Sequence, residues 1–314
     1  MKTKQLLDIG QKLYHWRPQK IINYRWLPIF LFRCFVARKE INKLEKHLNS
    51  TVIGKEFFEK HAPIWFQLTR QNFHMKSTTQ ERLSYMMNTW DFFEKWLSEE
   101  ARHNIYCDNS KSFRIWENKT DDKTLCLDLN FDDGEIKEGC MTIRLMQDES
   151  VVYHMNFWIG KIDKENKQVS AYIGCHQGSK DGLDINRDLT KQLFGCRPKN
   201  FVFIALQELL GHLGITELFA VSSEGHYSNK FRGDKRKPKV SYNDFWTECG
   251  GTICADSRFF AMPLHDKRKT MEEIPSKKRS TYRKRYELLD QVSVTIKAVL
   301  SNQKAENPGK KNNE

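Results

Sequence analysis

The sequence lacks the features of several protein classes. Its eight cysteines, spread from position 34 to position 254, have none of the dense spacing of a small disulfide-rich secreted domain, so we expect reduced thiols. Its most apolar early stretch, residues 26–37, is interrupted by Pro28 and Arg33. A membrane-spanning helix needs about 20 apolar residues, so this stretch is too short to cross a bilayer, although it could lie on one.

Other signals are also missing. The first 16 residues carry charge but no apolar core ending in small residues, so we expect no secretory signal and a cytoplasmic location. There is no internal repeat, no Walker loop and no dinucleotide fingerprint. Cys249 and Cys254, with His226 and His265 as the nearest histidines, are too loosely spaced for a structural zinc site, so we expect no metal site.

The sequence does contain enough apolar material for a sizeable core. Of its 314 residues, 39% are hydrophobic and 12% aromatic, which excludes collagen, a coiled coil and wholesale disorder. Lys and Arg number 52 against 40 Asp and Glu, a formal net charge of +12. That excess favours an anionic partner without identifying the anion.

Residues 1–107 are predicted to form an N-terminal helical region. Between Phe57 and Trp96, aromatic and apolar residues recur at steps of three and four, and we expect this stripe to pack in the core. Residues 77–79 precede Glu81, an arrangement that can cap the helix carrying residues 85–97.

Residues 108–300 are predicted to form a mixed α/β domain. Short apolar runs predict an antiparallel meander, followed by a strand, two helices and a further strand. The three predicted meander strands are residues 125–131, 140–146 and 151–159, and the next strand is residues 169–175. The helices are residues 188–194 and 198–213, and the last strand is residues 215–221. A long basic helix over residues 275–300 and a disordered tail over residues 301–314 complete an α+β fold with a mixed sheet and flanking helices.

Polar residues gather where the strand 215–221 ends, a common place for ligand sites. Ser222, Ser223, Glu224 and His226 could supply a proton acceptor and hydroxyl donors there, with Glu224 or His226 as catalytic base. The alternative is a capped turn with a surface histidine.

Two further carboxylates follow this cluster. Asp244 and Glu248 would share one face of a helix and are predicted to contribute to catalysis, positioning a base or binding a cation. The alternative is that they pair with the basic loop at residues 230–239.

The start of the long helix carries six cations around most of its circumference, leaving the side of Tyr282 and Tyr286 for packing. They are Lys277, Lys278, Arg279, Arg283, Lys284 and Arg285. Such mutual repulsion suggests an anionic counterpart, which could be lipid phosphate, a nucleic-acid backbone or a cofactor pyrophosphate. A merely solvated basic face is the alternative.

A glycine-punctuated loop after the strand 169–175 is a second candidate for phosphate binding. Gln177 and Gly178 lie in it, and its backbone amides could cradle a phosphate. An ordinary loop is the alternative interpretation.

Several linked motifs together resemble the VirK/YbjX family. They are Tyr172-Ile173-Gly174 with Gln177-Gly178, Gly195-Cys196-Arg197-Pro198-Lys199, Leu213-Gly214-Ile215 with His226, Tyr242-Asn243-Asp244-Phe245-Trp246 with Glu248 and Gly250-Gly251, and Ile274-Pro275-Ser276-Lys277-Lys278-Arg279 with Tyr282-Arg283. The resemblance implies a protein of Gram-negative bacteria linked to virulence, envelope properties and resistance to antimicrobial peptides. It brings no accepted catalytic mechanism, and Cys175-His176 departs from the two small or apolar residues expected there.

The order of elements over residues 169–221 also resembles the core of acyl-CoA-dependent N-acyltransferases of the GNAT type. In those folds the loop and helix N-terminus after the strand hold the cofactor pyrophosphate. This resemblance implies acyl-CoA as cofactor, with its phosphates held by Gln177, Gly178 and Arg197, and by Lys277, Lys278, Arg279 and Arg283. The additional helix over residues 188–194 is a departure from that core.

Two hypotheses from different classes follow. One is a GNAT-like acyltransferase acting on an envelope precursor. The other is a regulator or adaptor without catalysis, which docks on anionic lipid through residues 232–239 and 277–285 at the inner membrane. Nucleic acid is the less favoured anion because no nucleic-acid-binding motif accompanies the charge.

Overall fold

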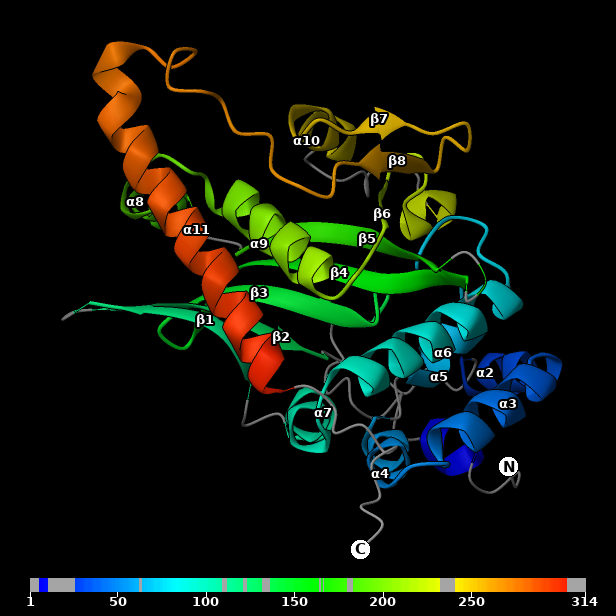
Figure 1. Cartoon of the computed structure of the whole chain (residues 1–314). Helices are drawn as coiled ribbons and strands as arrows, with labels where there is room; N and C mark the ends of the chain where they lie inside the picture. The colour runs from blue at the N-terminus through cyan, green and yellow to red at the C-terminus, as the bar shows by residue number, and fades with distance from the viewer. Residues whose placement is uncertain are drawn as a thin grey trace, which may run out of the picture.

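The computed structural model describes residues 6–10, 26–61, 64–108, 112–120, 123–131, 136–163, 165, 167–179, 183–231 and 241–303. Helices make up the N-terminal part, and a mixed sheet follows, which confirms the α+β class (Figure 1). The N-terminal helices are α2 (Trp26–Val36), α3 (Arg38–Leu48), α4 (Val52–Lys60), α5 (Ile64–Thr69), α6 (Thr79–Trp96) and α7 (Glu99–Tyr106). No helix among these described ranges is long and apolar enough to span a membrane.

Helix α6 begins at the cap that the sequence predicts. The Thr78 hydroxyl accepts a hydrogen bond from the Glu81 amide at 3.1 Å, and the Glu81 carboxylate accepts one from the Thr78 amide at 2.7 Å. This capping box satisfies two of the amides that a helix start leaves unpaired. Trp90 and Phe93 on this helix are buried, as the aromatic stripe predicts.

Eight strands form one mixed sheet in the order β1-β2-β3-β4-β5-β6-β8-β7. Their bounds are β1 (Phe113–Lys119), β2 (Thr124–Asn130), β3 (Met141–Gln147), β4 (Ser150–Asp163), β5 (Gln168–Gly178), β6 (Glu217–Val221), β7 (Thr252–Ile253) and β8 (Phe259–Met262). Strands β1 to β5 are an antiparallel meander, and β5 pairs with β6 in parallel, which confirms the predicted meander and crossover. The sequence analysis missed β1, β7 and β8.

The crossover contains α8 (Leu183–Gln192) and α9 (Pro198–His212). Helix α8 begins and ends earlier than the predicted 188–194. It cannot extend through Phe194 because Phe194 and Gly195 have φ angles of 50° and 79°, outside the helical region. Helix α9 follows the prediction closely, with Pro198 in its first turn.

Helices α9 and α11 (Arg279–Asn302) lie side by side over the sheet (Figure 1). Helix α9 packs on β3, β4 and β5, whereas α11 packs on α9 and β1. Leu289, Val292 and Ile296 of α11 are buried. The helix ends at Asn302, so it includes the first residues of the expected disordered tail; residues 304–314 of that tail lie outside the described residues.

Helix α6 covers an open part of β4. The pairing of β3 with β4 ends at Phe157, and β4 continues to Asp163. Beyond that point the Ile159 backbone amide donates a hydrogen bond to the Thr89 hydroxyl at 2.9 Å. The side-chain amide of Asn88 donates one to the Gly160 carbonyl at 2.6 Å. Side chains of α6 thus replace strand hydrogen bonds at this edge.

Strands β5 and β6 separate at the end that carries the candidate site. They pair only from Ser170–Glu217 to Ile173–Ala220, after which β5 continues along β4 to Gly178. Helix α10 (Tyr242–Glu248) fills the resulting space, and its Trp246 indole donates a hydrogen bond to the Val221 carbonyl at 2.9 Å.

Candidate anion-binding site at the start of α9

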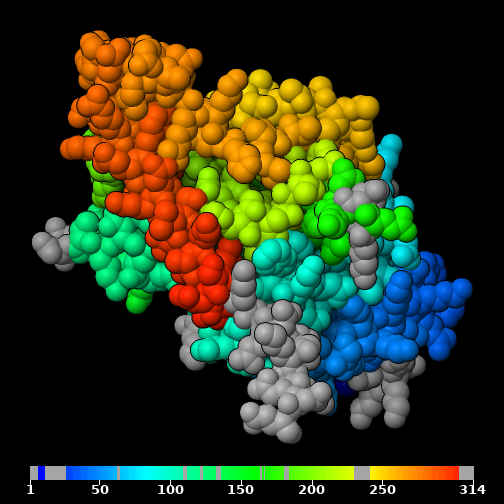
Figure 2. All heavy atoms as spheres, in the orientation of Figure 1, coloured from blue at the N-terminus to red at the C-terminus, as the bar shows by residue number. Residues whose placement is uncertain are grey.

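A cavity of about 270 Å³ lies at the N-terminal end of α9. Its walls come from the turn before α9, the first turn of α9, residues 266–269 and the first half of α11. Figure 2 shows α11, in orange and red, running down one side of the molecule beside the yellow and orange segment that precedes it. Segments far apart in the sequence therefore meet at one helix N-terminus.

The start of α9 favours an anion. Arg197 is the N-cap residue in an extended conformation and makes no side-chain capping bond, and Pro198 takes the first helical position. The partial positive charge of a helix N-terminus faces the cavity, so it adds to the charge of nearby side chains.

The cavity is lined by more cations than anions. Among the described residues its cations are Arg197, Lys267, Arg268, Lys269 and Arg285, and its carboxylates are Glu248 and Asp266. Burial is the main cause that raises the pKa of Asp266 above its usual value, so this carboxylate is easier to protonate than a free one. The lining has an excess of positive charge, as a phosphate site requires.

Arg285 is held in place by backbone and aromatic contacts. Its guanidinium donates to the Phe194 carbonyl at 3.0 Å and 2.9 Å and lies 4.2 Å from the Tyr282 ring centroid. Gly195 makes room for it, because a Cβ at that position would lie 2.7 Å from Arg285 Nη2. The positive φ of Gly195 also favours glycine.

Arg197 and Glu248, which both line the cavity, form a direct ion pair. Glu248 also contacts Lys199 Nζ at 3.5 Å and accepts a hydrogen bond from Asn200 Nδ2 at 3.2 Å. The pair joins α9 to α10, although 51 residues separate its members. Residues 232–239 of the basic loop lie outside the described residues, so the predicted alternative pairing of Asp244 and Glu248 with that loop is left open.

A buried histidine lies near the end of β5, next to helix α10. The Tyr153 hydroxyl lies 2.5 Å from His176 Nδ1, while His176 Nε2 has no hydrogen-bond partner among the described residues. The rings of Tyr242, Phe245 and Trp246 surround it. Burial is the main cause that lowers the pKa of His176 to about 3, and the charge of Lys199 adds to it. His176 is therefore neutral near pH 7.

Glu224 and His226 occupy a hydrogen-bonded turn. Asn243 Nδ2 donates to Glu224 at 3.0 Å, and this bond is the main cause that lowers the pKa of Glu224. His226 Nδ1 lies 2.8 Å from the Ser228 hydroxyl, and its backbone forms an isolated bridge with His74. The turn has the bonds of the capped-turn alternative, but His226 is buried instead of lying at the surface.

The structure brings only some of the predicted site residues together. Arg197 and Glu248 meet at the cavity, whereas Gln177 and Gly178 end β5 and do not line it. Asp244 is exposed on α10. The four remaining predicted cofactor contacts lie at the start of α11 or in the 3-10 turn η3 (Ser276–Lys278) before it, exposed except for the half-buried Arg279: Lys277, Lys278, Arg279 and Arg283.

Sequence reasoning missed the second basic wall of the cavity. Lys267, Arg268 and Lys269 are three consecutive cations, a visible signal, but nothing in the sequence indicates that they face α9. Arg268 is oriented by Asp290 at 2.7 Å and lies 5.1 Å from the Tyr286 ring centroid.

Comparison with known proteins places the chain in a family. A family model described as a protein of unknown function (DUF535) matches residues 20–298. The uncharacterized protein YbjX of Escherichia coli (strain K12) is 33% identical over 161 residues, which are 50% of this chain and 48% of that protein. An uncharacterized protein of Haemophilus influenzae is 34% identical over 182 residues, 56% of this chain and 58% of that protein.

The chain thus spans about half the length of the curated relatives it matches. No solved structure matches it. The family model covers most of the chain and the E. coli relative carries the family's name, so the chain belongs to the DUF535 family, the VirK/YbjX family that its motifs resemble.

Proposed function

We propose that the chain is an acyl-CoA-dependent acyltransferase of the GNAT type that acts on an envelope precursor and holds the cofactor phosphates at the start of α9. The observation that carries this proposal is the cavity with five cations around a helix N-terminus. One arginine guanidinium group can donate two parallel hydrogen bonds to two phosphate oxygens. A helix N-terminus adds attraction for the same negative charge.

The path of the chain supports the proposal. Strand β5, the crossover helices and the parallel strand β6 follow one another in the order on which the GNAT resemblance rests. In those folds the helix N-terminus after the strand holds the pyrophosphate. Here α8 intervenes, so the helix in the corresponding position is α9.

The size of the cavity limits what it can enclose. A volume of about 270 Å³ lies just below the range of sites for whole drug-sized ligands, about 300–1,000 Å³. It suits a phosphate-bearing head, and the rest of an acyl-CoA would lie along the surface or between α9 and α10. The Arg197–Glu248 ion pair joins α9 to α10 there, and both side chains are substantially exposed. Exposed pairs contribute only about 0.2–1 kcal/mol, so an anion can replace Glu248 at Arg197.

Acyl transfer also needs a proton acceptor. As the acceptor amine or hydroxyl attacks the thioester carbon, its proton passes to a base, the C–S bond breaks and CoA leaves as thiolate. Glu224 or His226 is our proposed base. Asn243, which binds Glu224, is five residues from Glu248 on α10, a rise of about 7.5 Å. An extended thioester arm can cross that distance.

Ligand binding tests the proposal. Thermal unfolding of the full chain is followed with acetyl-CoA, longer acyl-CoAs and CoA lacking its 3′-phosphate. A ligand at 100 times its dissociation constant stabilises by about 2.7 kcal/mol. We expect stabilisation by acyl-CoA, weakened by Arg197→Gln and Arg285→Gln. Arg187→Gln is the matched control, because Arg187 is exposed on α8 and pairs only locally with Asp184. Absence of any shift with every acyl-CoA would overturn the proposal.

A second candidate is an adaptor that docks on anionic lipid. Lys277, Lys278, Arg283 and Lys284 are exposed, and none of them forms an ion pair with a described residue. Co-sedimentation with vesicles of phosphatidylglycerol, compared with phosphatidylcholine alone, measures this role. Loss of vesicle binding in Lys277→Glu/Arg283→Glu, without loss of acyl-CoA binding, favours the adaptor. Unchanged vesicle binding rejects it.

A further inference from the structure

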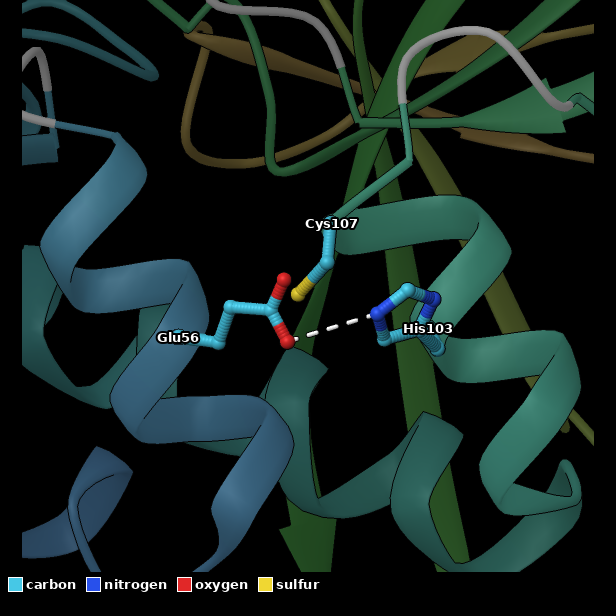
Figure 3. Close-up of side chains that lie close together, drawn as sticks. All are labelled: Glu56, His103 and Cys107. Atoms are coloured by element: carbon cyan, nitrogen blue, oxygen red, sulfur yellow. Dashed lines mark ion pairs between the residues drawn. The ribbon is translucent and has the colours of Figure 1, made fainter.

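Helices α4 and α7 bring three metal-ligating side chains together, none of which lines the cavity at the start of α9 (Figure 3). Glu56 on α4 faces His103 and Cys107 at the end of α7, and the three ligand atoms all lie within 4.8 Å of one another. Glu56 Oε2 and His103 Nε2 are already 3.3 Å apart. In the part of the chain that the structure describes, this is the one group of three such residues.

The local sequence explains the arrangement. His103 and Cys107 are four residues apart at the end of a helix, so they lie on one face. The Cys107 amide donates to the His103 carbonyl at 2.8 Å, which fixes their relative position. The Phe57 and Tyr106 rings, 5.3 Å apart at their centroids, pack α4 against α7. The cluster therefore rests on two packed helices.

The three donors match a particular class of metal ion. An imidazole nitrogen, a sulfur and a carboxylate oxygen are the ligands of zinc, at about 2.0–2.3 Å from the ion. In a tetrahedral site such distances place neighbouring ligand atoms about 3.3–3.6 Å apart. Side chains that lie within 4.8 Å need to close by little more than 1 Å. Magnesium and calcium prefer all-oxygen ligands and do not suit the set.

We propose that Glu56, His103 and Cys107 bind one borderline-soft divalent metal ion, best matched by zinc, with a water molecule in the fourth position. The Cys107 thiol releases its proton to solvent as the sulfur–metal bond forms. The bound ion links α4 to α7. This proposal is independent of acyl-CoA binding.

Lys60 orients the carboxylate for this role. Its ammonium donates to Glu56 Oε1 at 2.6 Å and to the Cys107 carbonyl at 3.0 Å, which leaves Oε2 directed at His103. One carboxylate oxygen can thus bind the ion while the other stays bonded to Lys60, an outer-shell arrangement common around protein metals. The negative charges of the Glu56 carboxylate and the Cys107 thiolate together neutralise a divalent ion. The positive charge of Lys60 beside the site therefore does not prevent metal binding.

Metal titration of the full chain tests the proposal. Protein stripped of metal is titrated with zinc alone in competition with a chromophoric chelator, and separately with cobalt(II). We expect one equivalent to bind tightly, and the cobalt form to show a thiolate-to-metal charge-transfer band with the visible bands of tetrahedral coordination. Glu56→Gln, His103→Gln and Cys107→Ser should each lower zinc affinity by more than about tenfold, since even outer-shell partners are worth 10- to 100-fold.

Matched controls separate this cluster from other histidines and thiols. His47→Gln removes a histidine paired with Asp91 at 2.6 Å, and Cys254→Ser removes a thiol outside the cluster. Both should leave affinity unchanged. The proposal is overturned if the three ligand variants bind zinc as tightly as the unmodified chain. Cobalt binding without a thiolate charge-transfer band also overturns it. If Cys107→Ser does not fold, the zinc affinity of Glu56→Gln and the cobalt spectrum of the unmodified chain test the proposal instead. The Glu56 side chain is 33% exposed, so this substitution leaves the core intact.

Discussion

Arg285, near the start of α11, donates two hydrogen bonds to the carbonyl oxygen of Phe194, 91 residues earlier in the chain. This contact fixes the turn that leads into α9 and presents the guanidinium to the cavity. A site assembled in this way depends on backbone geometry as much as on charge, and both can be tested separately.

The two members of the ion pair at the cavity should have opposite effects on anion binding. Arg197→Gln removes a charged donor, worth about 1.5–3 kcal/mol for a bonded phosphate, and should weaken acyl-CoA binding at least tenfold. Glu248→Gln removes a carboxylate that competes with the phosphate for Arg197, so it should tighten binding up to about fivefold. Isothermal titration of both variants measures this. Weakening by both substitutions would argue that the pair is structural.

Gly195→Ala should disturb the cavity through the backbone. The residue has a φ of 79°, and a Cβ would lie 2.7 Å from Arg285 Nη2. We expect a loss of about 1 kcal/mol in the free energy of unfolding in urea and weaker acyl-CoA binding. Gly211→Ala is the control, because Gly211 lies inside α9 and a Cβ there would lie 3.7 Å from His265 Cε1, an ordinary van der Waals contact. Alanine there should stabilise by up to about 1 kcal/mol.

The buried His176 predicts a loss of stability in acid. Its folded pKa is lowered to about 3, well below the value of about 6.5 for an unfolded histidine, so between these values only the unfolded chain takes up the proton. The contribution of the neutral His176 to the free energy of unfolding is therefore fully present above pH 6.5 and declines as the pH falls toward 3. At pH 5 the free energy of unfolding is lower by about 2 kcal/mol.

His176→Phe removes that titration. Urea unfolding at pH 7 and pH 5 should show a smaller loss of stability in the variant than in the unmodified chain. An identical pH dependence in His176→Phe would show that the imidazole is not held neutral in the folded protein.

Thr89→Val should weaken the contact of α6 with β4. The Thr89 hydroxyl accepts from the buried Ile159 amide, and valine of the same shape leaves that amide without a partner. An unpaired buried donor costs about 1–3 kcal/mol. Thr295→Val is the control, since among the described residues that hydroxyl bonds only to the Gln291 carbonyl of its own helix. Urea unfolding that finds equal losses in the two variants would contradict the edge role of Thr89.

The fold was largely predictable from the sequence, because local periodicity identifies each buried element by itself. Helix α9 and the strands β2 to β5 all carry such patterns. Strand β1 escaped because its last three residues are polar, with Asn118 and Lys119 exposed, and β7 and β8 are too short to show a period.

The candidate sites were less predictable because they depend on contacts between distant segments. Arg197 and Glu248 were each singled out, but their spacing along the chain does not indicate that they pair. His103 and Cys107 share a helix face, yet the third ligand, Glu56, belongs to another helix. Periodicity reports which face of an element is buried and leaves open which element it meets.

Helix α11 has a consequence for communication within the molecule. Its 24 residues span about 36 Å. Near one end Arg285 forms part of the cavity wall, and just beyond the other end the Gln303 carbonyl accepts a hydrogen bond from the amide of Ser98, the cap of α7, at 2.7 Å. Helix α11 thus connects the basic cavity to α7, the helix that carries His103 and Cys107. A displacement of α11 at one end therefore moves residues that contact the other site.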